Sequence, residues 1–383
     1  MEELNKYSST IILYSIIVIS ATIAAFASYR KGVLSRTGEN IAIKKKPTIS
    51  FFGAGITFII LWFPIAFANC GADYMVYNML FDRAKDWAFC VGYHQIEIGW
   101  AAFNYILRIF TDNVDIYNAI LAFVFLLIIF KAFFSLRDRI HFGWGILAFT
   151  TCVYLPFMNL KRISIAMAII FCAIKPLLEK KYLKAISYIA IACLFHTSAI
   201  IMIIPIAINW MIGRKLKYRE ILFCGVLAFF AIYLFRERIA NIIISERYDG
   251  YGLQNSSFGM MQMVYHLPLL YFLLKKSKTV EKGSTMTCLI LLVCSFIVGS
   301  MGYFISVVGR TYVYFLFVLC YIPSIAKTYK TIYGSKKTHL VVHIGVLDII
   351  YIVYFGFRLW IYFSGLMMSD QIAPYSNIFS MSF

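Results

Sequence analysis

The sequence predicts an all-α polytopic integral membrane protein with about 12 transmembrane helices, within a range of about 10 to 13. Of its 383 residues, 61% are apolar and only 14% are Asp, Glu, Lys or Arg, and the mean hydropathy is +0.78. A soluble domain of this size needs a far more polar surface. The apolar residues form long runs instead of the strict alternation of an outer-membrane strand, so we expect helices.

Twelve apolar runs separated by polar gaps are the predicted membrane spans. Sequence patterns place the boundaries of such segments to within about two to four residues. The predicted spans cover residues 11–28, 50–68, 117–135, 142–158, 163–178, 185–195, 198–212, 220–235, 258–274, 285–302, 304–325 and 340–363. We expect the whole chain, residues 1–383, to form a single transmembrane domain.

Positive charge is concentrated in alternate gaps. The formal net charge is +18, and 23 of the 36 Lys and Arg residues lie in the gaps 29–49, 136–141, 179–184, 213–219, 275–284 and 326–339. Loops rich in Lys and Arg stay on the cytoplasmic side, so these gaps are predicted to face inward. The charge therefore indicates topology and attraction to anionic lipid headgroups, and it does not indicate nucleic-acid binding. An even number of spans places both chain ends outside the cytoplasm.

Residues 185–212 depart from the regular pattern of spans. This stretch has basic flanks on both sides, and it is long for one span but short for two. A short re-entrant pair of helices that turns near His196 reconciles the length with the charges. Such backbone is tolerated where protein or a water-filled cavity surrounds it.

The longest gap, residues 69–118, is predicted to be an outer loop rich in aromatic residues and carboxylates. From Glu97 to Phe110 the apolar residues recur at helical spacing, which predicts an amphipathic helix on the outer membrane face. Aromatic faces stack on sugar rings and carboxylates accept hydroxyl protons, so carbohydrate is one ligand that suits this loop. A belt of Trp and Tyr at the membrane interface explains the same composition.

A second outer loop is predicted at residues 236–257. It contains Arg236, Arg238 and Arg247 close to Tyr248 and Tyr251. Outer loops usually carry few basic residues, so an anionic ligand at the outer face is one explanation. Ion pairs with acidic residues of the same loop are the other.

Three side chains carry charge or polarity at membrane depth, where such groups are costly and are retained mainly for function. Arg162, preceded by Lys161, lies at the outer end of a span, Arg310 lies inside another, and His196 lies in an apolar stretch. A guanidinium group binds phosphate with two parallel hydrogen bonds, so two arginines at similar depth suit a pyrophosphate. Alternatively, each arginine pairs with a carboxylate or extends to the interface, and His196 is a hydrogen-bonded structural residue.

Six segments in a fixed order give the chain a family resemblance. They read GADYMVY, QIEIGWAAFNYI, LKRISIAMAI, LFHTSAIIMI, SERYDGYG and VVGRTYVYF. Each is short and partly apolar, but the ordered set, from Asn69 to Tyr314, is much more specific. The chain resembles the EpsG family of bacterial exopolysaccharide polymerases and, more loosely, the Wzy O-antigen and capsule polymerases.

The resemblance implies a glycosyltransferase of the polysaccharide polymerase type, with an architecture similar to the GT-C class. Such enzymes transfer a growing glycan from undecaprenyl pyrophosphate to the next lipid-linked repeat unit. They do so in the bacterial cytoplasmic (inner) membrane, with the active site facing the periplasm or outside. The expected partners are undecaprenyl-pyrophosphate-linked oligosaccharides and membrane lipid, with a chain-length regulator as a further candidate. No metal ion or other cofactor is expected, and no metal-binding motif is present.

The residues that match the family segments are predicted to form the site. The catalytic candidates are Glu97, Asp73 and His196, and the sequence leaves open which of them is the general base. Pyrophosphate-binding candidates are Arg162, Arg310, Lys161 and Arg247. Glycan-binding candidates are Tyr74, Trp100, Tyr248 and Tyr251.

Two other functions remain alternatives to a polymerase. A flippase or exporter of lipid-linked oligosaccharides needs basic groups on a path through both leaflets, whereas here the polar loops are concentrated outside. A membrane O-acyltransferase would use a histidine at membrane depth, but it gives no role to the arginines or to the acidic loop. The sequence does not identify the sugars, the linkage or the stereochemistry, nor whether the product is an O-antigen, a capsule or an exopolysaccharide.

Overall fold

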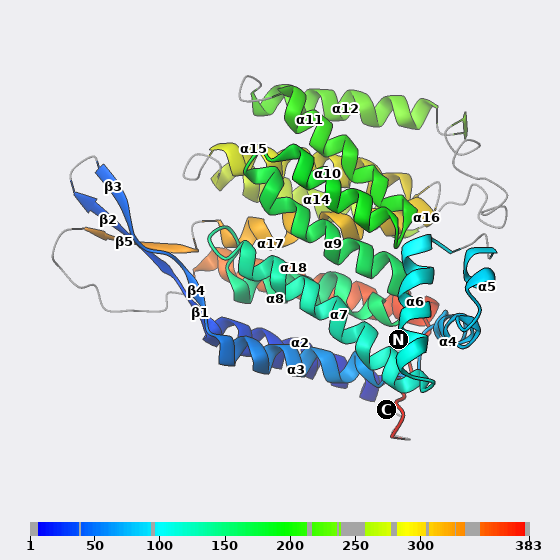
Figure 1. Cartoon of the computed structure of the whole chain (residues 1–383). Coiled ribbons are helices and arrows are strands. Elements are labelled where there is room, and N and C mark those ends of the chain that lie inside the picture. The colour runs from blue at the N-terminus through cyan, green and yellow to red at the C-terminus, as the bar shows by residue number, and fades with distance from the viewer. Residues whose placement is uncertain are drawn as a thin grey trace.

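The computed structural model describes residues 7–37, 40–92, 96–212, 217–235, 237–238, 257–276, 282–303, 306–325, 327–333 and 345–379. Long helices lie side by side in a bundle (Figure 1). A small β-sheet projects from one end of this bundle, and three short helices, α4, α5 and α6, lie at the opposite end (Figure 1). We refer to these as the sheet end and the loop end.

The helices of the first half of the chain follow the predicted apolar runs closely. They are α2 (Ser8–Ser28), α3 (Phe51–Ala66), α4 (Tyr74–Arg83), α5 (Trp87–Gly92), α6 (Ile98–Phe110), α7 (Val114–Ser135), α8 (Phe142–Phe149), the π-helix η1 (Thr150–Tyr154), the 3-10 helix η2 (Leu155–Met158), α9 (Lys161–Leu178) and α10 (Tyr182–Cys193). Helix α6 covers the stretch from Glu97 to Phe110 whose spacing predicted a helix, and its position on the outer membrane face remains a prediction.

The second half continues in the same way. Its helices are the 3-10 helix η3 (Thr197–Met202), α11 (Ile203–Ile212), α12 (Tyr218–Leu234), α14 (Ser257–Lys276), α15 (Lys282–Met301), α16 (Ser306–Gly309), the 3-10 helix η6 (Arg310–Phe315), α17 (Leu316–Ser324), α18 (Val346–Ile361), the π-helix η7 (Tyr362–Leu366) and α19 (Met367–Ser369). All twelve predicted runs therefore coincide with helix in the described part of the chain.

Four segments within the described ranges are long and apolar enough to cross a membrane as single helices. They are Ser8–Ser28, Val114–Ser135, Gly283–Met301 and Val346–Ser369. The other apolar helices are shorter or change type along their length; residues 142–158, for example, pass from α to π to 3-10 geometry around Pro156. The prediction of an all-α, multi-pass membrane protein is confirmed, while the number of spans and the GT-C architecture remain predictions.

Two of the basic gaps form strands that the sequence analysis did not predict. β2 (Gly32–Thr37) pairs antiparallel with β3 (Asn40–Lys45) and parallel with β5 (Tyr329–Tyr333), in the order β3-β2-β5. Below this sheet, β1 (Tyr29–Arg30) pairs antiparallel with β4 (Thr48–Ile49). The sheet joins segments about three hundred residues apart at the sheet end of the bundle (Figure 1).

The helical pair predicted around His196 is present. α10 leads to a turn at residues 194–196, and η3 and α11 return from it. At about 1.5 Å per residue, the twelve residues of α10 extend about 18 Å, which is too short for a bilayer core of about 30 Å. The turn near His196 is therefore confirmed, and its re-entry into the membrane remains a prediction.

Both described ends of the chain lie at the loop end. The backbone N–H of Tyr375 donates to Thr10 Oγ1 at 3.0 Å, and that of Asn69 donates to the carbonyl of Ser376 at 3.0 Å. This agrees with an even number of crossings between the two ends.

Candidate functional site

Glu97 is the centre of a polar cluster at the loop end. This residue precedes α6 and is 8% exposed. Its Oε2 accepts a hydrogen bond from Arg162 Nη1 at 2.8 Å, and its Oε1 lies 3.0 Å from His196 Nδ1. The backbone N–H and the hydroxyl of Thr197 also donate to Oε1, at 3.2 and 3.3 Å. Three predicted site residues from distant segments of the chain, Glu97, Arg162 and His196, are thus in direct contact.

Glycine at position 99 allows this contact to form. The N–H groups of Gly99 and Trp100 donate to the carbonyl of Leu194, at 2.8 and 3.2 Å, and so attach the start of α6 to the end of α10. A Cβ atom at position 99 would lie 2.7 Å from that carbonyl oxygen and 2.6 Å from the Leu194 Cβ. Only glycine permits so close an approach without a shift of one of the two elements.

The charge of Glu97 is fixed by its surroundings. Burial alone would raise the pKa of this carboxyl group. The hydrogen bond from His196 and the positive charge of Arg162 outweigh burial and lower the pKa to about 2. Glu97 is therefore a carboxylate near neutral pH, and it is a weak proton acceptor.

Lys161 and Arg162 are neighbours at the start of α9 but have different surroundings. Lys161 is 5% exposed, its Nζ donates to Asn118 Oδ1 at 2.6 Å, and it lies 5.3 Å from the ring centres of both Tyr74 and Tyr77. The side chain of Arg162 is 24% exposed even though it pairs with Glu97. Of the two cations, Arg162 has more surface for an incoming anion.

A second polar cluster surrounds Asp370, in the segment after the last helix. The backbone N–H of Asp73 donates to Asn159 Oδ1 at 3.0 Å, and Asn159 Nδ2 donates to Asp370 Oδ1 at 2.8 Å. The Tyr362 hydroxyl donates to Asp370 Oδ2 at 2.8 Å. Burial raises the pKa of Asp370, and the hydrogen bonds from Tyr362 and Asn159 and the charge of Arg310 oppose the rise. Asp73 is thus linked to Asp370 through Asn159, and the positive charge of Arg310 acts on the same carboxyl group.

The structure changes the assignment of one predicted residue, Trp100. Trp100 has no exposed surface, and its ring packs at 60° to that of Tyr77 with 5.5 Å between centres. Because Trp100 presents no face to a ligand, the proposed stacking on a sugar is wrong for this arrangement, and the ring belongs to the core. Arg310, expected inside a span, is exposed at the start of η6. Tyr74 is half-buried, and Arg247, Tyr248 and Tyr251 lie outside the described residues.

Three polar residues were not predicted from the sequence: Asp370, Asn159 and Arg358. Arg358 is 6% exposed, lies 4.4 Å from the ring centre of Tyr265 and donates to the Tyr354 hydroxyl at 3.3 Å. It falls within a predicted span, so the rule that identified Arg162 also applies to it. Asp370 and Asn159 carry no such signal, since each lies in a short connection beside a span.

Metal ligands do not gather in this region. Within the described ranges, no three side chains of His, Cys, Asp or Glu are grouped so that they could bind a metal ion.

Comparison with known proteins gives a family but no close relative. No curated protein and no solved structure matches the chain. The model of the EpsG family matches residues 53–377, which includes both polar clusters. The chain belongs to the EpsG family.

Proposed function

We propose that this protein is a polysaccharide polymerase that transfers a growing glycan from undecaprenyl pyrophosphate to the next lipid-linked repeat unit at the outer face of the membrane. The observation that carries the proposal is the contact between Glu97, Arg162 and His196 at the loop end of the bundle. It supplies a cation for a leaving pyrophosphate and a histidine for proton transfer at one place.

The reaction balances with these groups. The acceptor hydroxyl oxygen bonds to the anomeric carbon of the donor sugar. The bond between that carbon and the pyrophosphate oxygen breaks, and its electron pair leaves with the pyrophosphate. Charge develops on the leaving group, and Arg162 and Arg310 stabilise it there.

His196 is the proposed general base, with Glu97 as its partner. When Nδ1 of His196 donates to Glu97 Oε1, the lone pair lies on Nε2, which can accept the hydroxyl proton. Glu97 itself suits that role less, because its pKa of about 2 is far from the pH of the reaction. Asp73, whose backbone is held by Asn159, remains the second candidate for the base.

The test measures glycan length on gels from cells that lack this gene and carry wild type, Arg162→Ala, Arg310→Ala or His196→Ala. Single-repeat glycans in the deletion strain would establish a polymerase. We expect Arg162→Ala and His196→Ala to lower polymer output by about 100-fold or more. Arg83→Ala is the matched control, because Arg83 is an exposed arginine of the same loop that contacts the ring of Phe89.

Other outcomes of the same experiment would contradict the proposal. Near-normal polymer from both Arg162→Ala and Arg310→Ala would exclude the pyrophosphate role. Loss of all surface glycan, with lipid-linked repeats trapped inside the cell, would indicate a flippase. Full-length glycan that lacks only an acyl group would indicate an acyltransferase.

A further inference from the structure

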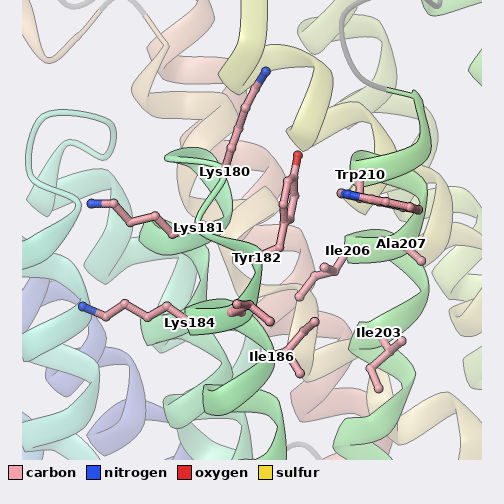
Figure 2. Close-up of a pocket in the computed structure, with 10 residues that line it drawn as sticks. Lys180, Lys181, Tyr182, Lys184, Ile186, Ile203, Ile206, Ala207 and Trp210 are labelled. Atoms are coloured by element: carbon pink, nitrogen blue, oxygen red, sulfur yellow. The ribbon is translucent and has the colours of Figure 1, made fainter.

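A groove of about 760 Å³ lies between the two legs of the hairpin that carries His196. One wall comes from the start of α10 and the other from α11 (Figure 2). The groove lies toward the opposite end of the hairpin from the turn at His196, and none of the proposed site residues lines it. It is therefore separate from the proposed polymerase site.

The walls of the groove are apolar and open to the surroundings. Ile186, Ile203 and Trp210 line it and are 40%, 39% and 67% exposed. The Tyr182 hydroxyl donates to Asn209 Oδ1 at 3.3 Å and so ties the two legs together beside the groove. In a membrane protein, apolar walls of this kind are covered by hydrocarbon chains.

The mouth of the groove carries positive charge. Lys180, Lys181 and Lys184 belong to its lining, and in Figure 2 Lys180 points past the end of the groove near Tyr182, whereas Lys181 and Lys184 extend to the side of α10 that faces away from α11. Lys181 pairs with Glu179 at 2.6 Å. Lys180 and Lys184 form no ion pair with any residue that the structure describes, and both are exposed. Two ammonium groups on long, flexible side chains are thus carried by the α10 wall of the groove.

We propose that this groove binds an anionic phospholipid of the inner leaflet. An acyl chain lies along Ile186, Ile203 and Ala207, while Lys180 and Lys184 hold the headgroup phosphate. Basic pockets between membrane helices on the cytoplasmic side bind anionic headgroups by this combination of contacts. Trp210 fits the same depth, because tryptophan favours the boundary between headgroups and hydrocarbon. The proposal assumes that the basic gaps face the cytoplasm, and it does not depend on the polymerase activity.

The charge at the mouth favours an anionic over a neutral lipid. Each lysine near an anionic membrane surface contributes about 1 kcal/mol, which corresponds to roughly a fivefold change in binding. The polyprenyl substrates of the proposed reaction carry their pyrophosphate at the loop end, so they do not supply the anion for this groove.

The test uses the purified full-length chain in vesicles of equal parts phosphatidylglycerol and phosphatidylcholine. The measured quantity is the ratio of the two lipids that stay bound after extraction, read by native mass spectrometry. We expect wild type to enrich phosphatidylglycerol, and Lys180→Asn/Lys184→Gln to lower that enrichment by roughly tenfold or more. Asparagine is chosen for Lys180, since its φ of 58° lies in the left-handed region that asparagine tolerates.

Two further variants separate this groove from general surface charge. Lys131→Gln/Lys275→Gln removes the same charge from exposed lysines that do not line the groove, and it should leave the ratio unchanged. Ala207→Trp fills the groove and should lower the enrichment of phosphatidylglycerol although all lysines remain. Each of three outcomes would overturn the proposal. They are an equal loss of enrichment in the Lys131/Lys275 variant, equal retention of both lipids by wild type, and an unchanged ratio in Ala207→Trp.

Discussion

Glu97 shows how the surroundings of one residue set its chemical role. Its pKa is lowered from 4.5 to about 2, because the hydrogen bond from His196 and the charge of Arg162 outweigh burial. A carboxyl group whose pKa is lower in the folded state stabilises that state above its ordinary pKa. This stabilisation is lost as the pH falls from about 4.5 through about 2. Glu97 therefore keeps its charge across the range in which activity is measured.

A pH experiment tests this fixed charge. We expect Glu97→Gln to reduce polymer formation about 100-fold, because His196 and Arg162 lose the negative charge of the carboxylate that both contact. Because Glu97 stays ionised between pH 5 and 8, it contacts His196 as a carboxylate over that whole range, and the variant should be impaired at every pH within it. Polymer formation from purified lipid-linked repeats provides the measurement. Polymer formation by Glu97→Gln at the wild-type level at any pH in this range would show that the carboxylate is not needed there.

Site residues that are polar and lie in or beside an apolar run could be predicted from the sequence. Site residues in short connections could not. Arg162 and His196 are polar groups beside or within apolar runs, so the cost of placing them there identified them in advance. Their contact with Glu97 was not predictable, because it depends on how a loop before α6 meets the end of α10. Asp370 belongs to the site through contacts with Asn159 and Tyr362, which sequence spacing does not reveal.

At the scale of elements, the contact between α6 and α10 determines where Glu97 lies. The Gly99 N–H donates to the Leu194 carbonyl at 2.8 Å, and a Cβ at position 99 would lie 2.7 Å from that oxygen. Gly99→Ala should push the start of α6 away from the hairpin and separate Glu97 from His196. A displacement of about 1 Å at a reacting centre costs on the order of 100-fold in rate.

Glycan length in complemented cells measures the effect of Gly99→Ala, with the amount of protein in the membrane determined in parallel. Gly92→Ala in α5 is the matched control, because a Cβ there would meet nothing within 4 Å. We expect normal polymer from Gly92→Ala and about 10- to 100-fold less from Gly99→Ala, at equal protein levels. Equal polymer from both variants would show that the close approach of α6 to α10 has no functional role.

The elements themselves were predicted unevenly. The long apolar runs predicted the helices, because an apolar segment of that length is easy to recognise in a sequence. The strands β2, β3 and β5 were not predicted, because each is only five or six residues long. They also lie in gaps between the apolar runs that were interpreted only by their positive charge. The parallel pairing of β2 with β5 joins two distant gaps, and no local pattern indicates such a partner.

At the scale of the whole molecule, the two ends of the bundle differ in chemistry. The loop end carries the carboxylates and arginines of the proposed site, while the sheet end is built from two of the basic gaps (Figure 1). The positive-inside rule predicts that the sheet end lies in the cytoplasm and the loop end outside. Both proposals depend on this orientation, because one needs an outer active site and the other an inner-leaflet lipid.

Two cysteine substitutions at opposite ends of the bundle test the orientation. Lys85, 65% exposed in its side chain, lies at the loop end, and Lys46 is exposed beside the strands of the sheet end. A maleimide that does not cross membranes should label Lys85→Cys in intact cells with a permeable outer envelope. It should label Lys46→Cys only after the cytoplasmic membrane is opened. The unsubstituted protein, with its nine native cysteines, gives the background. Because both variants replace an exposed lysine, a difference in labelling between them reports position alone. The reverse labelling pattern would place Glu97, Arg162 and His196 on the cytoplasmic side, where flipped lipid-linked substrates are absent.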